Sequence, residues 1–535
     1  MPPPVLRDLE KQGTHGGVLG WLEKTRARLE SSPLTPFDSA IGLAISIVVY
    51  LAMTFTPAGR HLWFDELFTY WIAQAPSLSQ LLKDVRLDLQ PPLSFLLVRG
   101  SIAMFGNSEF AARLPFLVFF LIGSLCLYRF VARRLRPVYG LLAMLVFWST
   151  PFLSYATEAR PYGLVIGFFG IAMLAWERAI QPRRSTLSIL MLGLAVLGMM
   201  LSHFFSPFYI WPFCFAEMWR SYRSRQFDPG IWMALLVPAV VPIYYFSRVS
   251  AYHSMALPAV QQASPFKILA FFYHTLEPEG IILLLAVGVA LILSFRRERE
   301  RVARTALMQP IDVAFTAGLL TMPVLLMTAL IAIHGGFFPR YGTPTLFAYG
   351  LLIAFFVAMY TNINRLAAAA ACCVLLAGIS GTEIVSTTLA TLRTWGKKPA
   401  ASVQTPPLER VRPDLPLVAA SGLTFLEMNK YENPATLSRL YYLSDRDLAL
   451  RYAHSTLFEG SFSELKKYFP VRANFASYRQ FVADHPHFLV LGTPDYPEDW
   501  LIRRLLDIHA TLDYLGSFPV PYKDHDVYAV TMPGT

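Results

Sequence analysis

The amino-acid sequence predicts an all-α, multi-span membrane bundle followed by a C-terminal α/β domain. Hydrophobic residues make up 54% of the 535 residues and charged residues only 15%, whereas a soluble domain carries about 25% charged residues. Apolar runs of roughly 20 residues, long enough to cross a bilayer, recur through the first two thirds of the chain. The composition then changes to a Pro-rich, basic link and short strand-like runs, which indicates a separate domain.

Residues 1–36 carry charge but lack the apolar core of a signal peptide, so we expect an uncleaved cytoplasmic segment. The membrane domain is expected at residues 37–386. Its apolar runs predict about eleven transmembrane helices. We place them at residues 39–57, 114–131, 138–154, 161–177, 186–202, 205–219, 231–247, 280–295, 312–333, 344–360 and 366–386.

The basic clusters predict how the chain is oriented in the membrane. They precede the first predicted span or follow the second, fourth, sixth and eighth. Because basic residues collect in cytoplasmic loops, we expect the N-terminus in the cytoplasm and the C-terminus outside. These loops also account for the net charge of +10, so nucleic acid is not expected as a partner. The chain has no N-x-S/T sequence, which agrees with a bacterial inner-membrane protein.

Three long segments are then expected on the outer, periplasmic side, at residues 58–113, 248–279 and 387–535. The first is unusually apolar, and "LFTYWIAQA", "SLSQLLKDV" and "PPLSFLLVRGSIAMFG" each have amphipathic helical character. We expect these juxtamembrane helices to lie along the membrane surface. A span at residues 91–106 would instead place the following basic clusters on the wrong side.

The segment 387–535 is predicted to be a linker and a small periplasmic α/β domain. "LPLVAAS", "RLYYLS", "HFLVLG" and "DVYAVTM" are strand-like, and "SYRQFVADH" and "DWLIRRLLDIHATLDYL" are helix-like. The four cysteines lie within predicted spans, so neither a disulfide framework nor a metal-ligand pattern is expected. They are Cys126, Cys214, Cys372 and Cys373.

Asp65 and Glu66 in "LWFDELFTYW" follow the first predicted span at its outer end. A carboxylate at a membrane boundary is costly unless it is solvated or paired, which makes it a candidate functional group. The alternative is a solvated span end, since acidic residues also favour the first turn of a helix.

Four motifs resemble one family of enzymes. "WFDELFTYW", "QPPLSFLLVRGSIAMFGNSEFAARLP", "ATEARPYGL" and "FFPRYGTP" are similar to motifs of the membrane-embedded GT-C glycosyltransferases, of the protein-mannosyltransferase-like and aminoarabinose-transferase-like group. The resemblance covers about residues 40–360. It implies a GT-C fold, a polyprenyl-phosphate-linked sugar as donor, and an outer-side active site in which Asp65 is the catalytic carboxylate and Glu66 its neighbour.

Two positions depart from the resembled branches. Gln90 stands before the two prolines, where aminoarabinose transferases have Lys and protein mannosyltransferases tend to have His. Phe68 stands where the aminoarabinose branch has a basic residue. Both differences argue against aminoarabinose as the sugar.

The reaction implied by the resemblance needs a base and fixed cations. A carboxylate that takes the acceptor proton contributes about 10²–10⁴-fold, and we assign this role to Asp65, with direct displacement and inversion at the anomeric carbon. Glu66 is expected to hold the acceptor or to orient Asp65. Arg160 and Arg340 are candidates for the leaving phosphate, because a guanidinium binds phosphate with two prongs. The alternative for both is an interfacial or ion-paired arginine.

Further candidates lie close to these residues in the sequence. Glu158 is either a second acidic group near the sugar or the partner of Arg160. Tyr162, Tyr341 and His203 are candidates for contact with sugar or phosphate, with an interfacial aromatic role as the alternative. Arg113 is expected to be structural, paired with Glu109 at i+4. No metal cofactor is expected, although His61 lies close to the acidic pair.

Two other functions compete with the glycosyltransferase. A transporter or flippase of lipid-linked sugars places its ionisable residues at the midplane and often has internal repeats. A polymerase or ligase of surface glycans is expected to use arginines and histidines in large outer loops. An acidic pair in the first outer loop favours transfer of a sugar from a polyprenyl-phosphate donor to a glycan, lipid or protein acceptor.

Overall fold

The computed structural model describes most of both predicted domains. The segment 1–35, the first part of 248–279 (residues 248–261), and most of the linker after the last predicted span lie outside the described residues, so the predictions for them remain untested. The described residues are 36–88, 90–242, 262–277, 280–294, 308–394, 408–454, 456, 462–493, 499–520 and 523–534.

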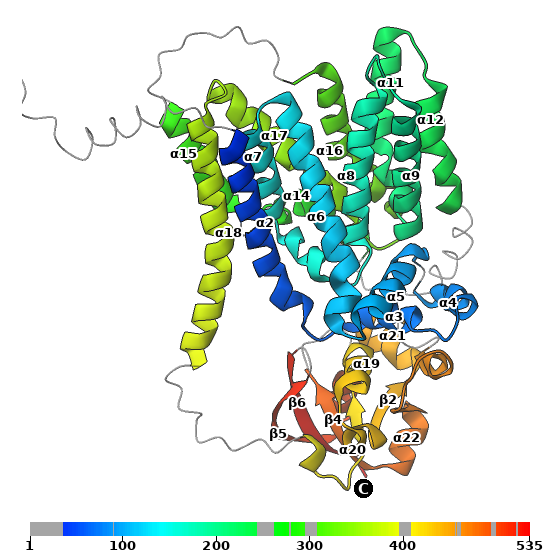
Figure 1. Ribbon diagram of the computed structural model, residues 1–535. Helices are drawn as coiled ribbons and strands as arrows, with labels where there is room; N and C mark the ends of the chain where they lie inside the picture. Colours follow the sequence, from blue (N-terminus) through cyan, green and yellow to red (C-terminus); the bar gives the residue numbers. More distant parts are fainter. Residues whose placement is uncertain are drawn as a thin grey trace, which may run out of the picture.

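The membrane domain is a bundle of helices in the upper part of Figure 1, above the C-terminal domain. Its described elements are α2 (Pro36–Ala58), α6 (Glu109–Arg134), α7 (Pro137–Trp148), η3 (Pro151–Thr157), α8 (Tyr162–Ala179), α9 (Thr186–Ser202), α10 (Ser206–Tyr209), α11 (Trp211–Ser224), α12 (Pro229–Leu236), η4 (Val237–Val240), α14 (Phe266–His274), α15 (Gly280–Ser294), α16 (Pro310–Ala332), η6 (Pro339–Thr345), α17 (Leu346–Tyr360) and α18 (Arg365–Thr394).

The described helices establish a multi-pass membrane protein but do not confirm eleven spans. Five are long and apolar enough to cross a bilayer, or six if the bent pair α7–η3 counts as one span. This pair turns by 83° where residues 138–154 were predicted to be straight, and Pro151 lies just after the break. The shorter apolar helices are Leu93–Phe105, Thr186–Ser202, Pro229–Val240, Gly280–Ser294 and Arg365–Gly381.

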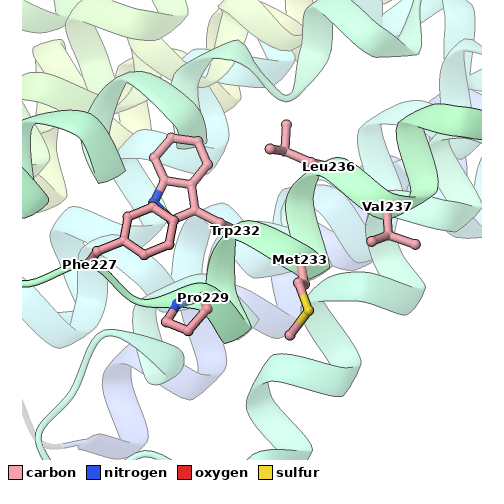
Figure 2. A pocket seen from close by; sticks show the side chains of 6 residues that line it. All are labelled: Phe227, Pro229, Trp232, Met233, Leu236 and Val237. Atoms are coloured by element: carbon pink, nitrogen blue, oxygen red, sulfur yellow. The ribbon is translucent and has the colours of Figure 1, made fainter.

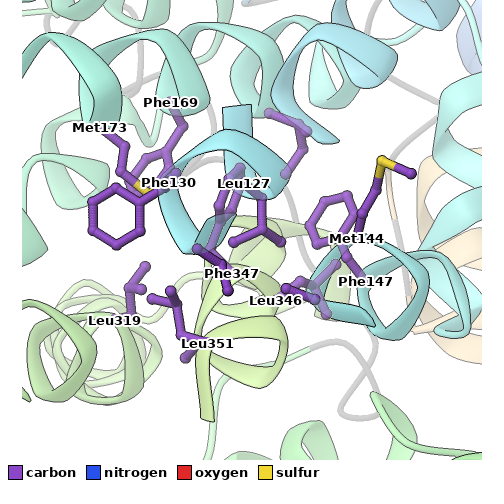
Figure 3. Close-up of a cluster of buried hydrophobic side chains, with 14 of the residues drawn as sticks. Leu127, Phe130, Met144, Phe147, Phe169, Met173, Leu319, Leu346, Phe347 and Leu351 are labelled. Atoms are coloured by element: carbon purple, nitrogen blue, oxygen red, sulfur yellow. The ribbon is translucent and has the colours of Figure 1, made fainter. Parts of the chain in front are cut away.

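Helices α6 and α8 pack closely because glycines face backbone at their interface. A Cβ on Gly123 would lie 2.4 Å from the carbonyl oxygen of Ile166, and one on Gly163 would lie 2.4 Å from that of Phe116. Small residues let membrane helices approach in this way. The core beside this interface is filled by large apolar side chains from α6, α7, α8, α16 and α17 (Figure 3). Close packing therefore brings the start of α8 near the start of α6.

The first outer segment forms three helices where the sequence predicts them. They are α3 (Phe64–Ala73), α4 (Leu78–Asp84) and α5 (Leu93–Phe105), with a short turn η2 (Val85–Leu87) between the last two. Figure 1 shows these helices at one end of the bundle, next to the C-terminal domain. Asp65 and Glu66 both lie in the first turn of α3.

A buried ion pair fixes α3 to α6. The guanidinium of Arg113 donates from Nε to Glu66 Oε1 at 2.7 Å and from Nη2 to Oε2 at 2.5 Å. It also donates to the backbone carbonyls of Ala58, Arg60 and His61. The two-pronged partner of Arg113 is thus Glu66, which the sequence did not predict, and the pairing with Glu109 at i+4 stays a prediction. Sequence spacing detects neighbours on one helix but not a carboxylate that folding brings from 47 residues away.

A second ion-pair network holds the other end of α6. Arg134 donates two hydrogen bonds to Asp312, at the start of α16, at 2.8 and 2.9 Å. It also donates to Glu177, near the end of α8, at 2.6 Å. Both carboxylates are almost fully buried. One arginine thus ties three helices together at the end of the bundle opposite α3.

The C-terminal domain has a six-stranded sheet in the order β3-β2-β1-β4-β6-β5. Strands β3, β2, β1 and β4 run parallel, while β6 is antiparallel to β4 and β5. The elements are η7 (Leu408–Arg410), β1 (Leu417–Ala419), α19 (Gly422–Tyr431), α20 (Pro434–Ser438), β2 (Leu440–Ser444), α21 (Arg446–Ala453), η8 (Phe462–Lys467), β3 (Asn474–Ser477), α22 (Tyr478–Asp484), β4 (His487–Gly492), α23 (Trp500–Asp507), β5 (Thr511–Val520) and β6 (Lys523–Thr531).

The α/β prediction for this domain is confirmed for its four predicted strands and for the helix α22. One predicted helix, "DWLIRRLLDIHATLDYL", is only half correct. Helix α23 ends at Asp507, His509 adopts a positive φ of 56°, and the strand β5 begins at Thr511. A residue with left-handed backbone geometry commonly follows the end of a helix. The residues after His509 form β5, which pairs with β6 and does not continue the helix.

A shallow apolar hollow near α12 is separate from the acidic pair. Figure 2 shows its lining side chains, which carry no ionisable group: Phe227, Pro229, Trp232, Met233, Leu236 and Val237. Chemistry on a sugar phosphate needs charged groups, so this hollow is not the candidate site.

We predict that removing Arg113 destabilises the protein much more than removing an exposed arginine from the same helix. Arg113→Ala leaves the buried carboxylate of Glu66 without its cation, and breaking a buried pair in this way costs about 3–5 kcal/mol. The measurement is the apparent melting temperature in detergent, with Arg129→Ala, an exposed position on α6, as the control.

The double variant Glu66→Ala/Arg113→Ala is expected to lose less stability than the two single variants added together. The reason is that no unpaired buried charge remains when both partners are gone. Additive losses, or an Arg113→Ala variant as stable as Arg129→Ala, would contradict a stabilising ion pair.

Candidate active site

Asp65 stands between two arginines from distant parts of the chain. Its Oδ2 lies 3.7 Å from Arg340 Nη2 and 3.9 Å from Arg160 Nε, and its side chain is 23% exposed. Both separations exceed the usual hydrogen-bond length of about 2.7–3.2 Å. The carboxylate is therefore held in a positive field while remaining accessible to a substrate.

Arg160, between η3 and α8, is fixed by its own contacts. It donates to Asp88 Oδ2 at 2.7 Å and to the backbone carbonyl of Asp65 at 3.1 Å. Burial raises the pKa of Asp88 to about 6, and the charge of Arg160 opposes this shift. The sequence analysis missed Asp88, although its position two residues before Gln90 and the paired prolines was a usable signal.

Arg340 comes from η6, at the start of the segment that continues into α17. Its guanidinium carbon lies 4.8 Å from the ring centre of Phe338 and 6.0 Å from those of Trp63 and Tyr162. Aromatic faces attract a guanidinium and limit its orientations. Arg340 is therefore partly held by rings, and its side chain remains 22% exposed.

Glu158 lies beside the same cluster. Burial raises its pKa to about 7, the charge of Glu66 adds to the increase, and the charge of Arg340 opposes it. The sequence left open whether Glu158 pairs with Arg160 or serves the substrate. The carboxylate that accepts a hydrogen bond from Arg160 is Asp88, which favours the second alternative.

The remaining candidates form an aromatic wall. The ring centre of His203 lies 5.5 Å from that of Tyr162 and 5.9 Å from that of Tyr341. His203 Nδ1 accepts a hydrogen bond from the backbone N–H of Phe205 at 3.1 Å. Gln90 lies next to this wall, because its Oε1 accepts from the backbone N–H of Phe204 at 3.4 Å. The structure thus gathers the predicted residues at one place.

Glu66 differs from the other candidates because its carboxylate is already bound on all sides. Besides Arg113, the backbone N–H groups of Trp63 and Ala159 donate to it, at 3.1 and 2.6 Å. Its exposed fraction is 0%. Of the two roles that the sequence left open, these contacts favour orientation of Asp65 over contact with the acceptor.

Unpaired polar atoms are concentrated around Asp65. Most buried polar groups in proteins have a hydrogen-bond partner, yet several buried atoms of this cluster have none. Within the described part of the chain they are Trp63 Nε1, Glu158 Oε2, Arg160 Nε, His203 Nε2 and Arg340 Nε. A pre-formed set of donors and one acceptor is what a polar ligand requires. Trp63 is a further residue that the sequence analysis missed.

The arrangement does not resemble a metal centre. No group of three or more His, Cys, Asp or Glu side chains in the described residues is suited to hold a metal ion. His61 is exposed and packs against the ring of Tyr431, with ring centres 4.1 Å apart. The cluster is therefore built from carboxylates, guanidinium groups and aromatic rings.

Comparisons with known proteins found similarities in sequence and in structure. Residues 89–246 match the family model described as dolichyl-phosphate-mannose-protein mannosyltransferase. ArnT from Cupriavidus metallidurans is similar in structure in its apo state and bound to undecaprenyl phosphate, with TM-scores of 0.49 and 0.46. Each is 13% identical and covers 92% of this chain and 97% of the solved one. None of the curated proteins matches the chain significantly.

The family match includes Gln90, Glu158, Arg160, Tyr162 and His203. It spans less than half of the chain, and Asp65 and Arg340 lie outside it. It agrees, over residues 89–246, with the resemblance seen in the sequence motifs, and the long apolar helices indicate a multi-pass membrane protein.

Proposed function

We propose that this protein transfers a sugar from a polyprenyl-phosphate donor, of the undecaprenyl-phosphate type, to an envelope acceptor on the periplasmic face of a bacterial inner membrane. The observation that carries the proposal is the accessible carboxylate of Asp65 between Arg160 and Arg340, surrounded by unpaired buried polar atoms. In this orientation the N-terminus lies in the cytoplasm and the C-terminal domain in the periplasm.

The proposed reaction is a direct displacement that inverts the anomeric centre. The acceptor oxygen forms a bond to the anomeric carbon and gives its proton to Asp65. The bond from that carbon to the phosphate oxygen breaks, and the electron pair leaves with the lipid phosphate. A positioned base lowers the barrier for the first event, and fixed cations stabilise the charge that develops in the second.

The two arginines suit the leaving phosphate for different reasons. Arg160 is buried and anchored by Asp88, so it provides a fixed charge. Arg340 contacts aromatic rings and lies 3.7 Å from Asp65, and its Nε has no hydrogen-bond partner, so this group is available to a phosphate oxygen. A guanidinium prefers such two-pronged contacts.

We predict that Asp65→Asn lowers the rate of transfer by at least about 10²-fold, because the amide cannot accept the acceptor proton. Donor binding is expected to persist, since the arginines remain. The measurement uses purified protein in sealed vesicles with a labelled polyprenyl-phosphate sugar, and Asp414→Asn, an exposed position, as the control.

Net movement of the labelled lipid without transfer would favour the flippase, and wild-type turnover by Asp65→Asn would exclude Asp65 as the base. If the lipid is consumed but the product is a lengthened surface glycan, the polymerase is favoured.

We predict that Arg340→Ala reduces kcat/KM for the donor by about 10²–10³-fold, as loss of one fixed donor does in other anion-stabilising sites. Arg340→Lys keeps the charge but not the fork, so an intermediate loss is expected. Steady-state kinetics measure the effect, with Arg129→Ala as the control. Equal activity of Arg340→Ala and Arg129→Ala would refute the phosphate assignment.

We predict a pH dependence of donor use that involves Glu158. Because its pKa is raised to about 7, the carboxyl is mostly neutral below this pH and ionised above it. The ionised form repels the donor phosphate, so KM for the donor should rise as the pH increases through about 7. Glu158→Gln should remove this increase; the same profile in both proteins would show that another group titrates.

A further inference from the structure

The C-terminal domain supplies hydrogen-bond acceptors to the backbone just before Asp65. Tyr431 and Glu427 both come from α19, which lies against α3 at the junction of the two domains (Figure 1). The hydroxyl of Tyr431 accepts from the N–H of Leu62 at 2.7 Å, and Glu427 Oε1 accepts from the N–H of Phe64 at 3.2 Å.

These contacts add to the local cap of α3, in which Glu66 accepts from the N–H of Trp63. The first N–H groups of an α-helix lack partners within the helix, and a polar side chain at the N-cap usually accepts one. The N-cap of α3 is Trp63, which has no side-chain oxygen. The acceptor for Phe64 is instead Glu427, 363 residues later in the sequence. A carboxylate at a helix N-terminus also interacts favourably with the helix dipole.

The backbone N–H groups of the three residues before Asp65 thereby each donate a hydrogen bond to a side chain, two to the C-terminal domain and one to α3. Tyr431 holds the N–H of Leu62, Glu66 holds that of Trp63, and Glu427 holds that of Phe64. Glu427 is 9% exposed, and burial raises its pKa to about 7 while the hydrogen bond from Phe64 opposes the shift. Burying a carboxylate costs free energy, which its contact with the amide partly offsets.

The interface between the domains does not depend on these two side chains alone. Lys430 Nζ donates to the hydroxyl of Tyr70 at 3.0 Å. The ring centre of Phe469 lies 5.4 Å from that of Phe68 and 5.2 Å from that of Trp71. Loss of one acceptor is therefore expected to loosen the start of α3 without separating the domains.

We propose that Glu427 and Tyr431 are positioning residues of the C-terminal domain, which hold the backbone at residues 62–64 so that Asp65 stands between Arg160 and Arg340. This role rests on the proposed function of Asp65 as the base. A displacement of about 1 Å at a reacting group lowers catalysis by as much as about 10²-fold. The C-terminal domain thus contributes to the active site through these backbone contacts.

The kinetic test compares Glu427→Ala, Glu427→Gln and Tyr431→Phe with Glu409→Gln, a carboxylate of the same domain that accepts from Asn433. We expect kcat to fall about tenfold in Glu427→Ala and Tyr431→Phe, with KM for the donor unchanged, because the phosphate site is intact. Glu427→Gln keeps an acceptor oxygen and should recover most of the rate. A wild-type kcat in both Glu427→Ala and Tyr431→Phe would overturn the proposal.

A structural test separates this proposal from the proposed function. Hydrogen–deuterium exchange of the full-length protein should show faster exchange over residues 62–66 in Glu427→Ala and Tyr431→Phe, and no change in Glu409→Gln. If the wild type transfers no sugar but exchange changes as expected, the proposed function fails while the positioning contacts stand. Unchanged exchange in this segment refutes them whether or not the enzyme is active.

Discussion

The buried ion pair between Glu66 and Arg113 is the interaction on which the candidate site depends. It joins the first turn of α3 to the first turns of α6, and Arg113 also binds the backbone that leads from α2 into α3. Two charges removed from water are costly unless their hydrogen bonds are satisfied, and here both groups are bound on several sides. Because Glu66 points into this network, its neighbour Asp65 is left to face the arginines.

The two arginines near Asp65 differ in how firmly their side chains are held. Arg160 is fixed by Asp88, whereas Arg340 is stabilised by rings and lies near the carboxylate without a close hydrogen bond. An anionic ligand therefore meets one rigid and one adaptable cation. Such an arrangement is ready before the substrate arrives, so little reorganisation is required during the reaction. The proposed function follows from this pre-arranged field more than from any single residue.

The sequence was sufficient for features that depend on local pattern. Periodicity identified the helices α3, α4 and α5, and short strand-like runs identified four strands of the C-terminal sheet. Motifs at outer span ends pointed to Asp65, Arg160 and Arg340, which the structure brings together because alternate loops meet at one end of a bundle.

Contacts between residues far apart in the sequence could not be predicted from local pattern. The ion pair between Glu66 and Arg113, 47 residues apart, was not predicted, and Asp88, Trp63 and Glu427 were not recognised at all. Each acquires its role only from the packing of distant elements. The bend between α7 and η3 was also not predicted, since the length of an apolar run does not reveal it.

The two arginine networks at the ends of α6 have a consequence for how the protein lies in the bilayer. This helix has 26 residues, or about 39 Å at 1.5 Å per residue, and it is anchored by Arg113 at one end and Arg134 at the other. A helix that ion pairs hold at both ends cannot shift along the neighbouring helices. Asp65 is thus kept at a constant depth, and under the proposed function the lipid-linked donor brings its phosphate to that level.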